Sequence, residues 1–316
     1  MKQQIENAYL KIEVSELGAT LVKLIEKETD TDLVLGFDDD RGYLDNNGAN
    51  IGASIGRNSN RIGNGRFELN GKTYQLTINN NMNQLHGGGF NGFGFKMWKL
   101  KEAKDDELVY YYDAKDGEEG FPGNCHAEVS YKLQDNNLII TFTGTSDQDT
   151  IFNMTNHSYF CLGDDNILDQ ELYVTSDKYS PTDEYALTLD EVRDVKDTPY
   201  DFREFTRIGS QLEKLKDGID NNYVWENMED KLMCELKNDK FKLSMYSDLP
   251  DMHIYTSYYL DPCTGKYGKQ YKRYSGIALE CQFYPNGINY SDYIKPILRK
   301  GEVSSHYMKI KIDTLK

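Results

Sequence analysis

Alternation of apolar and polar side chains at every second position is the feature of this sequence that most limits its fold. Leu10, Ile12 and Val14 follow this pattern, and so do residues 129–133, 138–142 and 308–312. Such alternation is typical of strands with one face on a core and the other toward water. Asp-Asn-Asn at 135–137 and Asn-Asp at 238–239 separate alternating runs, so we expect a hairpin at each place.

Helical periodicity is scarce by comparison. Ile208, Leu212 and Leu215 predict one short helix that ends at Gly218. The rhythm of strands separated by helices of 10–15 residues, which indicates a parallel sheet, is missing. We therefore predict an all-β fold, a large antiparallel β-sandwich with few short helices. Strand patterns continue from about residue 8 to 314 without a linker, so we expect residues 1–316 to form a single domain.

The charge balance narrows the class of partner. Thirty-six Lys and Arg stand against fifty-two Asp and Glu, which gives a formal net charge of −16. Nucleic acids and anionic membranes attract cationic surfaces, so we expect neither as a partner. No apolar run approaches the roughly 20 residues that span a bilayer. A neutral or cationic small molecule remains as the expected ligand, bound by a monomer or a homodimer.

The five cysteines favour a reducing compartment. They stand at 125, 161, 234, 263 and 281, without the close pairs of zinc or thioredoxin-like sites. Their number is odd, and residues 1–14 carry no apolar signal segment. We therefore expect free thiols, a cytoplasmic location and no metal site.

Two residues stand out as candidates for acid–base chemistry. His157 follows a strand-like run in NMTNHSYFCL, and Glu280 follows three apolar residues in SGIALECQF. Histidine titrates near neutrality, and an apolar strand seldom buries an unpaired carboxylate without cause. On local evidence each has two readings: His157 as a structural histidine or a general acid, and Glu280 as a salt-bridged strand end or a general base. His126 and His306 lie in alternating strands and are read as structural.

Two glycine-rich segments are candidates for ligand-binding loops. His86 precedes three glycines, which let a backbone approach a ligand closely but also make a plain turn. The segment GASIGRNSNRIGNGRF places Arg57, Arg61 and Arg66 among glycines. Neither segment is a nucleotide loop, because the Lys-Ser/Thr pair of a P-loop and the βαβ context of a dinucleotide fold are absent.

Taken together, the motifs resemble the aldose 1-epimerases, or galactose mutarotases. The resemblance is carried, in family order, by LVLGFDDDRGYL, GASIGRNSNRI, NNMNQLHGGGFNGFGFKMW, TNHSYFCLG, TPYDFR, DGIDNNYVW and LECQFYPNGIN. It covers nearly the whole chain. It implies an antiparallel β-sandwich that interconverts the α and β anomers of free hexoses such as galactose and glucose without a cofactor.

The resemblance also implies roles for individual residues. Glu280 of LECQ resembles the catalytic base, and His157 of TNHSYF the catalytic acid. Opening a pyranose removes a proton from the C1 hydroxyl and protonates the ring oxygen, and the two groups, on opposite sides of the sugar, can do both together. A nearby anionic carboxylate would keep His157 protonated near neutral pH. The residues that resemble the sugar-binding set are Asn60, Arg61, His86 and Asp220.

The chain departs from the family pattern at three places. PNGIN at 285–289 replaces the usual PDAxN, and Cys161 replaces Asn in NHSYFNL, which puts a thiol near the expected site. His253 stands where many members carry an amide. His253 is therefore expected to face the sugar, and the preferred sugar is left open.

Three other functions remain as alternatives. A glycosidase would need a second carboxylate near Glu280, for which Asp220 is the candidate. A carbohydrate-binding or sensor module would need no acid–base pair. A sugar-phosphate epimerase would need several convergent cations, for which Arg57, Arg61 and Arg66 are the candidates.

Overall fold

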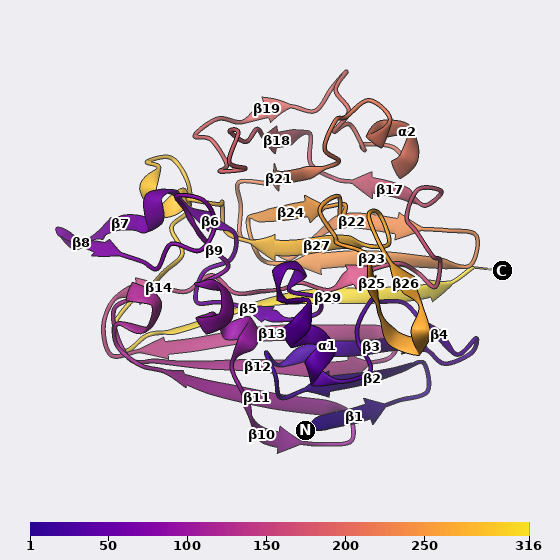
Figure 1. Cartoon of the computed structure of the whole chain (residues 1–316), viewed down its shortest axis with the longest axis horizontal. Helices are drawn as coiled ribbons and strands as arrows, with labels where there is room; N and C mark the ends of the chain where they lie inside the picture. Colours follow the sequence, from indigo (N-terminus) through magenta and orange to yellow (C-terminus); the bar gives the residue numbers. More distant parts are fainter. Residues whose placement is uncertain (316) are drawn as a thin grey trace.

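The long strands form a nine-stranded antiparallel sheet (Figure 1). The computed structural model describes residues 1–315, apart from the side chain of Asn47. Both predicted hairpins are confirmed, because β12 pairs with β13 and β22 with β23. Along β12, buried residues occupy every second position, as the sequence pattern predicted. The strands, in sheet order, are β10 (Lys99–Ala103), β11 (Glu107–Ala114), β12 (Cys125–Gln134), β13 (Asn137–Ser146), β29 (Val303–Thr314), β23 (Phe241–Ser247), β22 (Lys231–Lys237), β17 (Glu171–Val174) and β20 (Thr206–Arg207).

A six-stranded sheet supplies the platform for the candidate site. Its central strands differ from the alternating pattern, since all six residues of β27 are buried. One face of β27 enters the hydrophobic core through Leu279 and Cys281, so Glu280 points to the opposite face. That face carries buried polar side chains, among them Glu280 and Gln282. In sheet order the strands are β16 (Tyr159–Phe160), β27 (Ile277–Gln282), β24 (Asp251–Tyr255), β21 (Asp220–Val224), β18 (Lys178–Ser180) and β19 (Arg193–Asp194).

A four-stranded sheet and short elements complete the structure. The four strands are β1 (Lys2–Glu6), β2 (Leu10–Ser15), β3 (Thr20–Glu26) and β4 (Thr31–Asp32). Two-stranded ladders join β5 (Ser54–Ile55) to β15 (Thr155–Asn156), β6 (Arg61–Ile62) to β9 (Gln84–Leu85), β7 (Arg66–Leu69) to β8 (Lys72–Gln75), β14 (Thr150–Ile151) to β28 (Ile297–Leu298), and β25 (Cys263–Thr264) to β26 (Gln270–Tyr271). The 3₁₀ turns are η1 (Asn47–Ala49), η2 (Gly63–Gly65), η3 (Gly89–Asn91), η4 (Phe93–Phe95), η5 (Glu118–Gly120), η6 (Lys266–Gly268) and η7 (Gly287–Asn289).

The α-helices of the described chain are short, as the sequence predicted. They are α1 (Asp40–Asp45) and α2 (Ile208–Leu212). The predicted helix begins at Ile208 as expected but ends at Leu212, before Leu215. Neither helix has the length and apolar character needed to cross a membrane.

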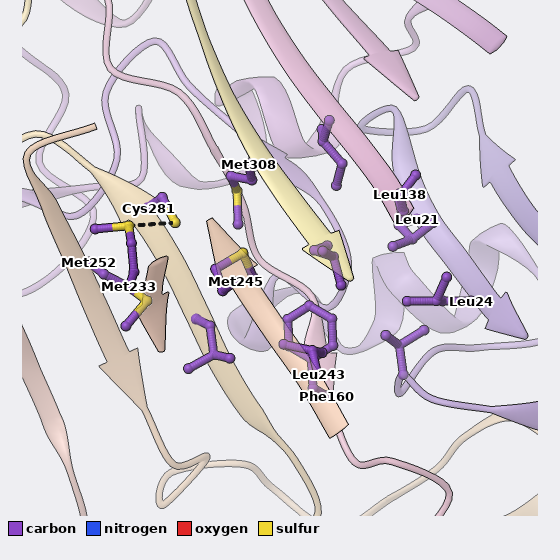
Figure 2. Close-up of a cluster of buried hydrophobic side chains, with 14 of the residues drawn as sticks. Leu21, Leu24, Leu138, Phe160, Met233, Leu243, Met245, Met252, Cys281 and Met308 are labelled. Carbon is purple, nitrogen blue, oxygen red and sulfur yellow. Dashed lines mark hydrogen bonds between the residues drawn. The ribbon is translucent and has the colours of Figure 1, made fainter. Parts of the chain in front are cut away.

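The three larger sheets share one buried cluster. Leu21 and Leu24 of β3, Leu138 of β13 and Met308 of β29 lie in it together with residues of β24 and β27. Figure 2 shows part of this cluster, where the Cys281 thiol donates a hydrogen bond to the Met233 sulfur at 3.5 Å. Each large apolar side chain buried this way contributes about 1.5–3 kcal/mol to folding. Sheets packed through a common core confirm the predicted β-sandwich.

Candidate active site

A cavity of about 410 Å³ opens on the polar face of the six-stranded sheet. This volume lies in the usual range for small-molecule sites. The sheet supplies the floor, and loops around residues 48–61, 80–86 and 184–186 supply the walls. The lining residues are Gly48, Asn50, Asn60, Arg61, Asn80, Asn81, Leu85, His86, His157, Tyr159, Glu184, Tyr185, Ala186, Asp220, His253, Tyr255, Tyr259 and Glu280. The residues that resemble the family's catalytic and sugar-binding set, together with His253, are therefore brought to one cavity.

Glu280 and His157 lie side by side at the floor. Glu280 is the fourth residue of β27, and His157 directly follows β15, held by a backbone hydrogen bond to Ala53. The Glu280 Oε1 and His157 Nε2 atoms are 3.5 Å apart, and both side chains are at most 5 % exposed. The prediction that Glu280 ends a strand is wrong, because β27 continues to Gln282. At 3.5 Å the two groups cannot lie on opposite sides of a sugar, so both must face it from the same side.

Burial decides how the pair holds its protons. Burial raises the pKa of Glu280 well above its usual value, and the negative charge of Asp220 raises it further. Burial also lowers the pKa of His157 to about 4. Both shifts favour a protonated Glu280 beside a neutral His157 over the charged pair. The expectation that the carboxylate keeps His157 charged does not hold in the unliganded site, because removing both groups from water penalises the ion pair.

His86 is fixed by a reciprocal pair of hydrogen bonds with Asn60. The His86 backbone N–H donates to the Asn60 carbonyl at 3.1 Å, and the Asn60 N–H donates to His86 Nδ1 at 3.2 Å. The short ladder between β6 and β9 holds the two segments together. Burial lowers the pKa of His86 well below its usual value, and the neighbouring His157 adds to this effect. With Nδ1 accepting, the proton of the neutral ring stays on Nε2, so His86 offers a donor on that nitrogen.

The same hydrogen bond bears on metal binding. His86, His157 and Glu280 offer ligand atoms within 4.8 Å of one another, a set that zinc or iron would accept. A ligating histidine presents a lone pair to the metal and keeps its proton on the other ring nitrogen. In His86 the other nitrogen already accepts from a backbone N–H, so Nε2 carries the proton. The trio therefore fits a hydroxyl ligand better than a cation.

Asp220 and His253 of the sheet and Arg61 of β6 form a polar group in the cavity. The Asp220 Oδ1 and His253 Nε2 atoms are 2.6 Å apart, on adjacent strands β21 and β24. Burial alone would raise the pKa of Asp220, but the hydrogen bond from His253 and the charge of Arg61 lower it overall. Arg61 donates to Asn80 at 3.0 Å. His253 lines the cavity and contacts the Asp220 carboxylate. Because the pKa of Asp220 is lowered, its carboxylate is kept as an acceptor for hydroxyl groups.

Three tyrosines and an acidic loop line the cavity without having been identified from the sequence. Tyr159 packs its ring against that of His157, with centroids 5.0 Å apart. Tyr255 and Tyr259 are more exposed than Tyr159, and Glu184 and Tyr185 come from a separate loop. Among these residues, Tyr159 alone could have been identified locally, from its position two residues after His157.

Other residues from the sequence lie outside the cavity. Arg57 is 2 % exposed and donates to the carbonyls of Pro122 and Gly123, so its role is structural. Arg66 lines a separate surface hollow. Of the three candidate arginines, the cavity lining therefore contains Arg61 alone, and the cation cluster needed for a sugar phosphate does not form.

Cys161 also lies away from the cavity. It is buried and lines a hollow of about 20 Å³ beside Lys266, which is too small for a sugar. Burial raises the pKa of the Cys161 thiol to about 11, so it stays protonated. His126 and His306 pair with surface carboxylates on the nine-stranded sheet, in agreement with a structural role.

Comparison with known proteins gives one consistent family. The model of the aldose 1-epimerase family matches residues 1–311. The galactose mutarotase of Homo sapiens is 34% identical over 96% of this chain and 92% of its own length. The aldose 1-epimerase of Escherichia coli K12 is 32% identical over 94% of this chain and 90% of its own. The crystal structure of an aldose epimerase homologue from C. elegans superposes with a TM-score of 0.92 at 29% identity, over the whole of both chains.

Proposed function

The chain belongs to the aldose 1-epimerase family, and we propose that this isomerase interconverts the α and β anomers of free hexoses such as galactose and glucose through Glu280 and His157. The observation that carries the assignment is the buried Glu280–His157 pair at the floor of a sugar-sized cavity. A pair of groups that exchange one proton is what ring opening and closure require.

The adjacent placement of the two groups suits the reacting atoms. The hydroxyl oxygen and the ring oxygen are both bonded to C1, so one sugar face presents both to the pair. Glu280 takes the proton of the C1 hydroxyl while His157 gives its proton to the ring oxygen, and the C1–ring oxygen bond breaks. The aldehyde rotates about the C1–C2 bond, and the two residues exchange roles as the ring closes on the other face of C1.

The electrostatics of the floor favour the opened state. After ring opening, Glu280 holds a proton and His157 is neutral, which is the arrangement that burial stabilises. The reaction starts from the ion pair of Glu280 and His157, which burial disfavours. When His157 gives its proton to the sugar and Glu280 takes one from it, both charges disappear and the burial penalty is relieved. Each acid–base group typically contributes about 10²–10⁴-fold to a rate. Sugars mutarotate unaided, so two such groups and positioning are sufficient.

Other residues that line the cavity supply the remaining contacts with the sugar. We assign hydroxyl recognition to Asp220 as an acceptor and to Arg61 and the Nε2–H of His86 as donors. Asn60 holds His86 in place, and His253 holds Asp220 ionised and beside the hydroxyls. The substrate is expected to be uncharged, because Arg61 is the one Lys or Arg among the lining residues.

The wider setting is also proposed. One buried cluster contains residues from Ile5 to Ile312, which supports a single domain over residues 1–316. The five cysteines are free, which supports a cytoplasmic location. We propose a small-molecule aldose as the partner, with no nucleic acid or membrane, for a monomer or homodimer.

Polarimetry on fresh α-glucose and α-galactose tests the function. The protein should accelerate the approach to the equilibrium rotation, and Glu280→Gln and His157→Asn should each nearly abolish the acceleration. Wild-type rates from both variants would contradict the assignment. Release of a monosaccharide from an aryl glycoside would instead indicate a glycosidase using Glu280 and Asp220.

A further inference from the structure

A buried tyrosine of the nine-stranded sheet directs its hydroxyl group to the strand that precedes His157. Tyr131 lies on the core face of β12, which it shares with Ala127, Val129 and Leu133, and it is fully buried. A buried phenol hydroxyl group costs free energy unless it is hydrogen-bonded, and a phenylalanine would fill the same space. The hydroxyl group of Tyr131 is therefore not explained by packing of the core.

This hydroxyl group uses its full hydrogen-bonding capacity. It donates to the Ala19 carbonyl, accepts from the Asn156 side-chain amide at 3.2 Å, and lies 3.1 Å from the Ser54 hydroxyl oxygen. A phenol has one proton to give and can also accept, so the three contacts are compatible. Ala19 directly precedes β3, Ser54 begins β5 and Asn156 ends β15. The Tyr131 hydroxyl group therefore joins three segments that are distant in sequence.

Asn156 transmits this contact to its neighbour His157. The Asn156 side-chain amide also donates to the Gly52 carbonyl at 2.9 Å. The Gly52 backbone N–H donates in turn to the His157 carbonyl at 2.9 Å. Asn156 thus holds the segment that binds the backbone of His157, and the Tyr131 hydroxyl group holds Asn156.

The position of the His157 ring allows little movement. Its Nε2 atom lies 3.5 Å from Glu280 Oε1, and both groups must reach atoms bonded to the same carbon of the sugar. A displacement of 1 Å in such a site can cost roughly 10²-fold in rate. A contact that fixes the segment around His157 therefore bears directly on proton transfer.

We propose that Tyr131 is a positioning residue, whose hydroxyl group fixes Asn156 and thereby holds the His157 imidazole beside Glu280 for proton transfer. The proposal rests on the proposed function of the cavity. The residues assigned to the hydroxyl groups of the sugar lie elsewhere, on β6, on β21 and after β9. Loss of the Tyr131 hydroxyl group should therefore lower kcat and leave KM unchanged.

Two matched substitutions test the proposal. Tyr131→Phe removes the hydroxyl group and keeps the ring. Tyr110→Phe is the control, because Tyr110 is fully buried on the neighbouring strand β11 and its hydroxyl group donates to the Val14 carbonyl at 3.4 Å. Polarimetry on glucose and galactose gives kcat and KM. We expect Tyr131→Phe to lower kcat about tenfold, with KM within about twofold of wild type. Tyr110→Phe should keep both constants within about twofold of wild type.

Titration of the His157 ring followed by NMR tests the same contact without a substrate. The ring signals of His157 are identified by their loss in His157→Asn. Burial lowers the pKa of His157 to about 4. The titratable groups that face this ring are Glu280, His86, Tyr159, Asp220 and His253. A ring that is no longer held admits water, which reduces the burial penalty on its charged form. The pKa should therefore rise in Tyr131→Phe and stay at the wild-type value in Tyr110→Phe.

The outcomes separate the two proposals. If the wild type accelerates mutarotation and Tyr131→Phe loses no more kcat than Tyr110→Phe, the positioning role is overturned and the proposed function stands. A rise in KM at unchanged kcat would overturn it as well. If the wild type accelerates neither sugar, the proposed function falls, and an unchanged His157 pKa in Tyr131→Phe would overturn the structural contact too. Should Tyr131→Phe fail to fold, Ser54→Ala removes the adjoining hydroxyl group and is judged by the same criteria.

Discussion

Replacing Glu280 with Gln should abolish activity and increase stability in one step. Glutamine keeps the size of the side chain, so the packing of β27 is preserved. It cannot take a proton from the sugar or return one, so both ring opening and ring closure lose a partner. Acid–base catalysis contributes about 10²–10⁴-fold, which corresponds to about 3–5 kcal/mol of activation free energy. Asp220 cannot replace Glu280, because it is engaged by His253. We expect kcat to fall by at least 10²-fold.

The gain in stability follows from the pKa of Glu280. Burial raises that pKa above the value in the unfolded chain, so folding binds a proton at pH values between the unfolded and the folded pKa. The stability of the wild type therefore falls as pH rises from the unfolded pKa, about 4.3, through the folded one. Glu280→Gln removes this dependence. Its melting temperature should exceed that of the wild type at pH 8, and the difference should disappear near pH 4.

Two measurements check this prediction. Polarimetry gives kcat, and thermal unfolding followed by circular dichroism at pH 4, 6 and 8 gives the stability difference. Glu68→Gln on β7 is the control, because Glu68 is exposed and should change neither quantity. A variant that keeps kcat within tenfold of wild type would refute the role of Glu280. A variant that melts below wild type at pH 8 would refute the argument that burying this carboxyl group is costly.

The other predictions concern the rest of the site and its support. His157→Asn should lower kcat by about 10²–10⁴-fold by polarimetry, and a loss below threefold would exclude His157 as a proton carrier. Because burial lowers the pKa of His157 to about 4, kcat/KM should stay level from pH 7 to 5 and decline toward pH 4, as the Glu280–His157 pair takes a second proton. A fall of kcat/KM to half its value near pH 6.5 would contradict this. Arg57→Met should lower the free energy of unfolding in urea by at least about 2 kcal/mol, because the buried carbonyls of Pro122 and Gly123 lose a charged donor. An unchanged urea midpoint would show that these carbonyls do not depend on Arg57. Dialysis against EDTA should leave kcat/KM unchanged because His86 presents an N–H at Nε2, and a loss restored by zinc would prove that argument wrong.

The sequence predicted the long strands because their side chains alternate against water. Along β12 and β13, packing on one side alone sets the period, so pattern and burial agree. Strand β27 does not follow this rule, because Glu280 and Gln282 lie on a buried polar face and all six of its residues are buried. A polar residue in a strand looks the same in sequence whether it faces water or an enclosed site.

The geometry of the site depends on short elements that carry no pattern. The two-residue strands β6 and β9 place Asn60 against His86, and both residues have positive φ. Two residues cannot show a period, so only the family resemblance indicated that these segments meet. The proton arrangement of Glu280 and His157 was also beyond the sequence, because it depends on burial that the fold creates.

The position of β29 has a consequence for how the protein is made. Strand β29 lies between β13 and β23 and pairs with both over most of its length. During synthesis, residues 303–314 leave the ribosome after all the remaining strands of the sheet have emerged. Until then β13 and β23 each expose an unpaired edge, and exposed edges invite pairing with other chains. The nascent chain should therefore be most prone to aggregation just before β29 emerges, and it should depend most on chaperones at that stage.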